Sequence, residues 1–147
     1  MENKSSLYDS DFALWLEKTV SQLKGRNTKD LDWDNLIEEI ESLGKRDKRE
    51  LRSRLTTLLE HALKRQYVPL PDCYRGWDVT ISRTQQALQE ILSDSPSLRN
   101  YLFNVIDECY QKALKNVQKE YDVDFPDFYP FCKDVDQLLS DQGFSNE

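Results

Sequence analysis

The sequence has few residues that break helices. Among 147 residues there are 4 Gly and 5 Pro, and the 20 Leu outnumber the 12 Val and Ile together. This balance excludes a loop-rich chain and favours helices, because an unbranched side chain loses little rotamer freedom in a helix. We therefore expect an all-α fold with almost no sheet.

Histidine and paired cysteines are also scarce. The residue three before the single histidine, His61, is Leu58, whereas di-iron helical bundles need Glu-x-x-His pairs on facing helices. The three cysteines, Cys73, Cys109 and Cys132, form no C-x-x-C pair and lie at no zinc-ligand spacing. We expect reduced, partly buried thiols, no metal site and no cofactor.

Long hydrophobic runs are absent as well. No stretch of about 18 apolar residues could form a membrane span, and residues 1–12 lack the apolar segment of a signal peptide. We expect a soluble, cytoplasmic protein without a membrane partner.

The charge is unbalanced toward acids. The chain has 27 Asp and Glu against 20 Lys and Arg, a net charge of -7, which excludes a generally basic nucleic-acid coat. A chain of 17.4 kDa has enough residues for one ordinary core. We expect one domain over residues 1–147, with its core at about 7–140.

Helical periodicity predicts a bundle of about four main helices. The first should run over residues 9–24, with Asp9 as N-cap and Gly25 at C′. The second should start at Asp32 and reach Tyr67. Apolar residues follow one side of each helix and should pack into the core. They are Phe12, Trp15, Leu16, Val20 and Leu23 in the first, and Leu36, Ile37, Ile40 and Leu43 at the start of the second.

The second helix contains a seven-residue interval, 44–50, without an apolar residue. The apolar faces before and after it differ by only about 50°, which one curved helix could absorb. The sequence therefore leaves open one long helix or two nearly collinear helices with a break at Gly44.

The rest of the chain predicts two more helices and a tail. A loop over 68–75 should precede a third helix, which has Trp77 on its apolar stripe. A fourth helix should follow, with Ser95 as its N-cap and Pro96 at N1, and should reach Tyr121. The aromatic-rich tail, 122–132, should be irregular but ordered against the core, followed by a short helix at 135–139 and a frayed end at 143–147.

Residues 45–65 invert the overall charge. This window has eight cations against three acids, a net of +5, so the rest of the chain carries -12. Helical geometry places Lys45, Lys48, Arg49 and Arg52 in one stripe, which we call the basic stripe. It could pair with the acids of this protein or of a second copy, bind a protein partner, or bind nucleic acid. We favour them in that order because the net charge opposes long-range attraction of nucleic acid.

Two patterns could support catalysis. Glu38, Glu39 and Glu41 could form an acid/base pair, but their place beside a cationic stretch favours a solvated, salt-bridged helix face. His61 should lie at the edge of the core, bonded to a carboxylate or a backbone group, rather than transfer protons. The sequence contains no Gly-rich phosphate loop and no G-x-S-x-G motif.

Several blocks resemble the bacterial, largely cyanobacterial family described as domain of unknown function 29. The blocks are residues 7–12 with Trp15, residues 36–44, 51–55, 58–61 and 64–67, then Trp77 with 80–83, and residues 94–98. The resemblance covers nearly the whole chain. It implies a small all-helical soluble protein and supplies no catalytic residue, cofactor or partner.

The matching blocks contain polar and aromatic positions that we treat as a candidate polar cluster. They are Glu38, Glu41, Arg52, His61, Lys64, Trp77 and Arg83. Residues of this kind can also hold helices together without forming a site.

The sequence favours a protein-interaction or self-associating module without enzymatic activity, which uses the second helix and the basic stripe as its contact surface. Two alternatives stay open. One is a nucleic-acid-linked regulator such as an antitoxin-like component, and the other is an enzyme with His61 as base and Glu38 or Glu41 as its orienting acid.

Overall fold

The structure, a computed structural model, describes residues 6–141, 143 and 144. These residues form six α-helices, four of them long, and no strand, which confirms the prediction of an all-α fold. The chain divides into two compact units, Met1–Arg46 and Asp47–Glu147. The prediction of a single domain stays a prediction.

The first unit begins with two helices where the sequence predicted one. Helix α1 spans Leu7–Ser10 and α2 spans Phe12–Lys24. The prediction of Asp9 as N-cap was wrong. Ser6 caps α1, and Asp11, with φ −154° and ψ 87°, interrupts the helix and caps α2 by accepting a hydrogen bond from the Leu14 backbone N–H.

Helix α2 ends in a turn whose left-handed residue is Arg26, with φ 60°. The sequence placed this role at Gly25, but Gly25 has φ −82°. Backbone N–H groups of Arg26 and Asn27 donate to the carbonyls of Leu23 and Gln22 and so close the helix end.

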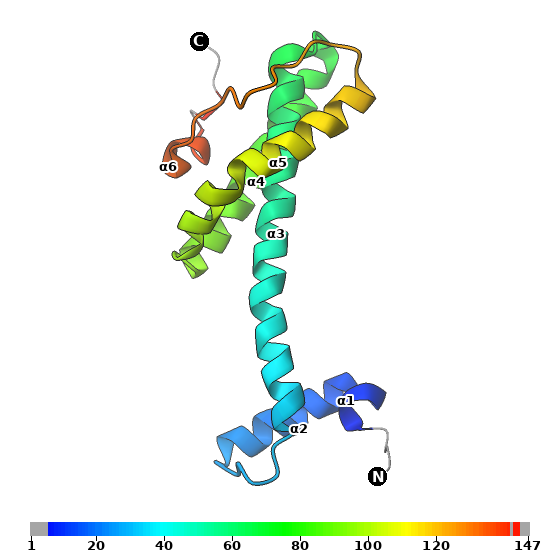
Figure 1. The fold of residues 1–147 in the computed structure, drawn as a ribbon, viewed down its shortest axis with the longest axis vertical. Helices are drawn as coiled ribbons and strands as arrows, with labels where there is room; N and C mark the ends of the chain where they lie inside the picture. Colours follow the sequence, from blue (N-terminus) through cyan, green and yellow to red (C-terminus); the bar gives the residue numbers. More distant parts are fainter. Residues whose placement is uncertain (1–5, 142, 145–147) are drawn as a thin grey trace. The chain divides into compact units, whose positions relative to one another are not determined.

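Helix α3 spans Trp33–Tyr67, and α2 crosses its start (Figure 1). The indole N–H of Trp15, a buried residue of α2, donates to the Asp32 carboxylate over 3.1 Å. The Tyr8 hydroxyl of α1 donates to the Glu39 carboxylate. These two bonds fix α1 and α2 against the start of α3.

Helix α3 continues through Gly44 without a break, which decides between the two arrangements that the sequence left open. A Cβ atom built at Gly44 would meet nothing within 4 Å, and its φ is not positive. No backbone feature at this glycine therefore requires the helix to end.

The second unit holds the hydrophobic core. The C-terminal part of α3, with α4 (Pro71–Asp94) and α5 (Leu98–Glu120), contributes most of its buried residues. Figure 1 shows α4 and α5 as an antiparallel pair beside this part of α3. Among the fully buried side chains are Leu51, Leu55, Leu58, Leu59, Leu63, Leu88, Leu102 and Tyr110.

Two predicted helix starts in this unit were wrong. Helix α4 begins at Pro71, inside the predicted loop, because proline at the first helical position loses no intrahelical hydrogen bond. Helix α5 begins at Leu98, without a side-chain cap. Ser95 is instead the C-cap of α4, and its carbonyl accepts from the Leu98 N–H in a turn.

The aromatic tail is irregular and packs on the core, as predicted. Phe125 is buried, and the Tyr110 hydroxyl of α5 donates to the Pro126 carbonyl over 2.5 Å. Helix α6, Val135–Leu138, follows. The sequence predicts that residues 143–147 fray, and residues 145–147 of this segment lie outside the described residues. The Phe144 ring lies 5.0 Å from that of Phe131.

Candidate functional site

Two members of the basic stripe interact with α5 of their own unit. Arg52 forms an ion pair with Glu108, and the Lys48 ammonium lies 5.2 Å from the centre of the Tyr101 ring. A hydrogen bond to Tyr101 and the charge of Glu108 raise the pKa of Arg52. Side chains of α5 therefore already contact two of the four cations of the stripe, Lys48 and Arg52.

The other two members are less engaged. Arg49 is exposed and has no ion-pair partner among the described residues. Lys45 is exposed and belongs to the first unit. The role of the stripe in binding a partner stays a prediction.

His61 lies at the edge of the core. Its Nδ1 is 2.9 Å from the Thr57 carbonyl oxygen, and since a carbonyl can only accept, Nδ1 carries the proton. Within the described residues no carboxylate lies in hydrogen-bond reach of His61. The bond to a backbone group is one of the two arrangements that the sequence predicted for a structural histidine.

The structure brings Lys64 and Trp77 of the candidate polar cluster together. The Lys64 ammonium lies 6.0 Å from the Trp77 ring centre and 3.1 Å from Oε1 of Glu120. Arg83 is exposed and lacks an ion-pair partner in the described part of the chain. Glu38 and Glu41 are exposed side chains of the first unit.

The buried cysteine, Cys109, lacks the properties of an activated nucleophile. All three are free thiols, and Cys109 is buried with its Sγ 3.7 Å from the Arg52 carbonyl oxygen. Burial raises the pKa of the Cys109 thiol and so disfavours the thiolate that would attack a substrate. Across residues 6–141, 143 and 144, no three His, Cys, Asp or Glu side chains form a metal-binding group.

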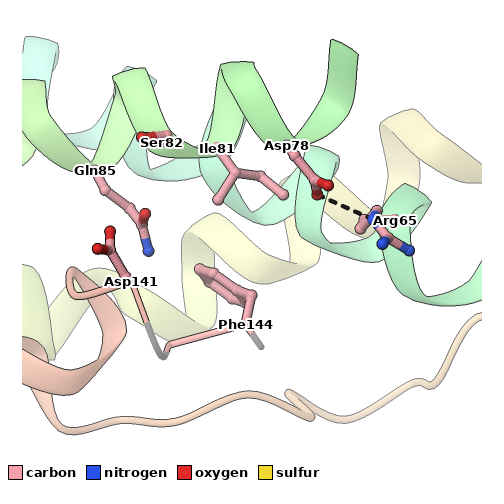
Figure 2. A pocket seen from close by; sticks show the side chains of 7 residues that line it. All are labelled: Arg65, Asp78, Ile81, Ser82, Gln85, Asp141 and Phe144. Carbon is pink, nitrogen blue, oxygen red and sulfur yellow. Dashed lines mark hydrogen bonds and ion pairs between the residues drawn. The ribbon is translucent and has the colours of Figure 1, made fainter. Parts of the chain in front are cut away.

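A small cavity of about 270 Å³ lies in the second unit (Figure 2). It is bounded by the end of α3, one side of α4 and the C-terminal segment. Its lining residues are Arg65, Asp78, Ile81, Ser82, Gln85, Asp141 and Phe144.

Most polar groups of this cavity bind the protein itself. The Arg65 guanidinium donates to Asp78 over 2.9 Å and lies 4.0 Å from the centre of the Tyr74 ring. The Gln85 amide, which is buried, donates to the Leu138 and Ser140 carbonyls over 3.0 and 2.8 Å. This arrangement holds α3, α4 and the tail together and contains no pair of nucleophile and base.

The largest departure from the sequence analysis is an exposed apolar surface in the first unit. Of thirteen large hydrophobic side chains that are exposed in the described residues, nine lie between residues 12 and 43, with exposed fractions of 39–60%. They are Phe12, Leu14, Leu16, Val20 and Leu23 of α2, and Trp33, Ile37, Ile40 and Leu43 of α3. The sequence predicted most of them to face the core.

The helical spacing of these residues correctly indicated apolar helix faces. It could not show whether another part of the protein covers those faces. Within the first unit, the buried positions of α2 are Trp15 and Thr19. Leu16 directly follows Trp15, and Val20 directly follows Thr19. Each exposed residue therefore lies about 100° further round the helix than the buried residue before it. We refer to the eight residues other than Leu14 as the apolar surface, because Leu14 points to another side of α2.

Nothing in the described helices is long and apolar enough to cross a bilayer.

Comparison with known proteins identifies a family whose function is unknown. No curated protein and no solved structure matches this chain. One family model matches residues 7–144, nearly the whole chain. The chain therefore belongs to the family described as domain of unknown function DUF29.

Proposed function

We propose that this protein acts as a protein-interaction module and that the apolar surface of its first unit is the contact face. The observation that supports the proposal is the concentration of exposed hydrophobic side chains between residues 12 and 43. Single exposed hydrophobic residues are ordinary, but their concentration on two successive helices of one unit is typical of a site of association.

The size of the surface suits a protein partner. With usual side-chain areas, the exposed parts of its eight residues amount to roughly 700 Å², against about 800 Å² that each partner contributes to a standard complex. Exposed aromatic residues such as Phe12 and Trp33 are the type that dominates binding energy at such interfaces.

The charges around the surface favour protein over nucleic acid or an anionic membrane. Residues 7–43 contain nine Asp and Glu against four Lys and Arg. This excess of acids repels phosphate groups, whether of a nucleic acid or of lipid headgroups. An apolar face with an acidic border fits another protein.

Site-specific cross-linking tests this function in the cells that produce the protein. A photoreactive amino acid replaces Leu16, which belongs to the apolar surface, and in a matched control it replaces Leu14. The two leucines lie on the same helix with similar exposure, 45% and 48%, but about 160° apart around it.

We expect a discrete protein adduct from position 16 and none from position 14. Mass spectrometry then identifies the partner, which is either a second copy or another protein. The absence of any protein adduct at position 16 would overturn the proposed function.

A further inference from the structure

We infer that the partner of the apolar surface is a second copy of this chain, paired antiparallel along α2. This inference rests on the proposed function and names the partner of the same surface. Three features of α2 support it, namely its heptad spacing, the sizes of its residues and the charges at its edge.

The exposed side of α2 has the spacing of a coiled-coil seam. Ala13, Leu16, Val20 and Leu23 are three, four and three residues apart, as successive a, d, a and d positions require. The three large residues are 39–45% exposed. Ala13, Leu16 and Val20 line a shallow groove on this face.

The sizes of these residues match in an antiparallel pair. In such a pair an a residue of one helix faces a d residue of the other. Ala13 then meets Leu23 of the second copy, and Leu16 meets Val20. The smallest residue faces a leucine, so the four layers fill space without leaving gaps.

The charged edge of the groove complements itself. Glu17 and Lys24 both border the groove and both occupy the e position of the heptad. In an antiparallel pair the e edge of one helix faces the e edge of the other, so Glu17 of each copy is opposite Lys24 of its partner. A two-fold axis makes this contact twice, as an isologous dimer requires.

A parallel pair would not use these charges. There the e edge faces the g edge, whose positions in α2 are Phe12 and Thr19. The antiparallel arrangement is therefore the one that both the core sizes and the charges favour.

The test measures the mass of the purified full chain in solution by sedimentation at roughly micromolar to 100 µM concentrations. We expect the wild type to sediment with twice the mass of the 17.4 kDa chain. Leu16→Glu should be monomeric, because a carboxylate would be buried in the seam, and Leu14→Glu should stay dimeric. Circular dichroism checks that both variants keep the helical content of the wild type.

Charge exchange tests the antiparallel arrangement. Glu17→Lys and Lys24→Glu should each weaken the dimer about tenfold, because each places like charges opposite one another. The double variant should return to within about threefold of the wild type, and so should an equal mixture of the two single variants, since both restore opposite charges across the axis.

Each outcome bears on a different part of the inference. A monomeric wild type overturns the second copy as partner, while a cross-link from position 16 to another protein would still support the proposed function. A dimer that survives Leu16→Glu overturns α2 as the interface. Loss of the dimer in the single charge variants without recovery in the double variant and the mixture overturns the antiparallel arrangement.

Discussion

The Lys64 ammonium forms an ion pair with Glu120 over 3.1 Å although only 11% of the lysine side chain is exposed. The carboxylate side of this pair is half exposed, at 51%, and the lysine ammonium lies 6.0 Å from the centre of the Trp77 ring. A cation so far removed from water is costly unless a partner compensates it, so this pair links α3 to α5 at a point where the lysine alone would be unfavourable.

We expect the two partners of this pair to respond unequally to substitution. Glu120→Gln leaves a nearly buried ammonium without a carboxylate and should lower the free energy of unfolding by about 1 kcal/mol, a value limited by the exposure of Glu120. Lys64→Met keeps the packing near Trp77 and removes the charge, so it should change stability by less than about 1 kcal/mol.

Urea denaturation of the two single variants and the double variant measures this difference. The double variant should match Lys64→Met alone, because no ammonium is left to compensate. A larger loss in Lys64→Met than in Glu120→Gln would contradict this account of the pair.

The continuity of α3 through Gly44 gives a second prediction. Glycine inside a helix costs about 0.5–1 kcal/mol relative to alanine, and a Cβ atom at this position would meet nothing within 4 Å. Gly44→Ala should therefore raise the stability of the helix by about that amount, seen as a higher thermal midpoint in circular dichroism. A lower midpoint would show that the helix is interrupted at this residue.

Tyr110 links α5 to the tail and gives a prediction for pH. Burial raises the pKa of its hydroxyl from 10 to about 12. Since the pKa is higher in the folded state, the stability from the neutral phenol is full below pH 10 and is lost as the pH rises through about 12.

Tyr110→Phe should lower stability by about 1 kcal/mol, because the Pro126 carbonyl loses its donor. In an ultraviolet absorbance titration, this variant should also lack one of the phenols that ionise at high pH. Tyr74→Phe is the control, because its hydroxyl makes no hydrogen bond among the described residues. Titration of Tyr110 near pH 10 in the folded protein would contradict the burial of its hydroxyl.

Gln85 gives a prediction for the short helix α6. Its amide donates to the carbonyls of Leu138 and Ser140, so Gln85→Ala should release α6 and increase hydrogen exchange there. Gln86→Ala is the matched control, because Gln86 is exposed and, within the described part of the chain, donates only to Ser82. Equal exchange at 135–140 in both variants would mean that other contacts hold α6.

The pairing of the basic stripe gives a prediction for nucleic acid. Arg52 and Lys48 interact with α5, and the chain is acidic overall, so we expect little retention of the wild type on DNA or RNA near 50 mM salt. A filter-binding assay measures it. Strong retention that falls steeply with salt and is abolished by Arg49→Glu would instead support the nucleic-acid alternative.

Local patterns predicted most of the fold. Leucine-rich stripes at helical spacing identified the four long helices, and the prolines and aromatics after residue 121 identified the ordered tail. The errors lie at helix ends, where several polar residues compete to cap. Asp9, Asp11 and Ser6 are all suitable side chains, and tertiary contacts such as the bond from Trp15 to Asp32 are not encoded in residue spacing.

The candidate site was harder to predict than the fold. Spacing shows that Leu16 and Ile40 lie on apolar faces, but it does not show whether a face packs inside the protein or stays exposed. The partners of Lys48, Arg52 and Lys64 come from α5, far along the sequence, so only the packing of the second unit brings them together.

The bonds that hold the tail have a consequence for how its sequence can change. Gln85, Tyr110 and Gln111 supply the donors, and the tail supplies backbone carbonyl oxygens. Every amino acid has such an oxygen, so replacements in the tail preserve these bonds as long as its path is kept. Replacements at exposed positions of the tail, such as Phe128, therefore leave these bonds in place, while the donors on α4 and α5 are the residues whose replacement would redirect the tail.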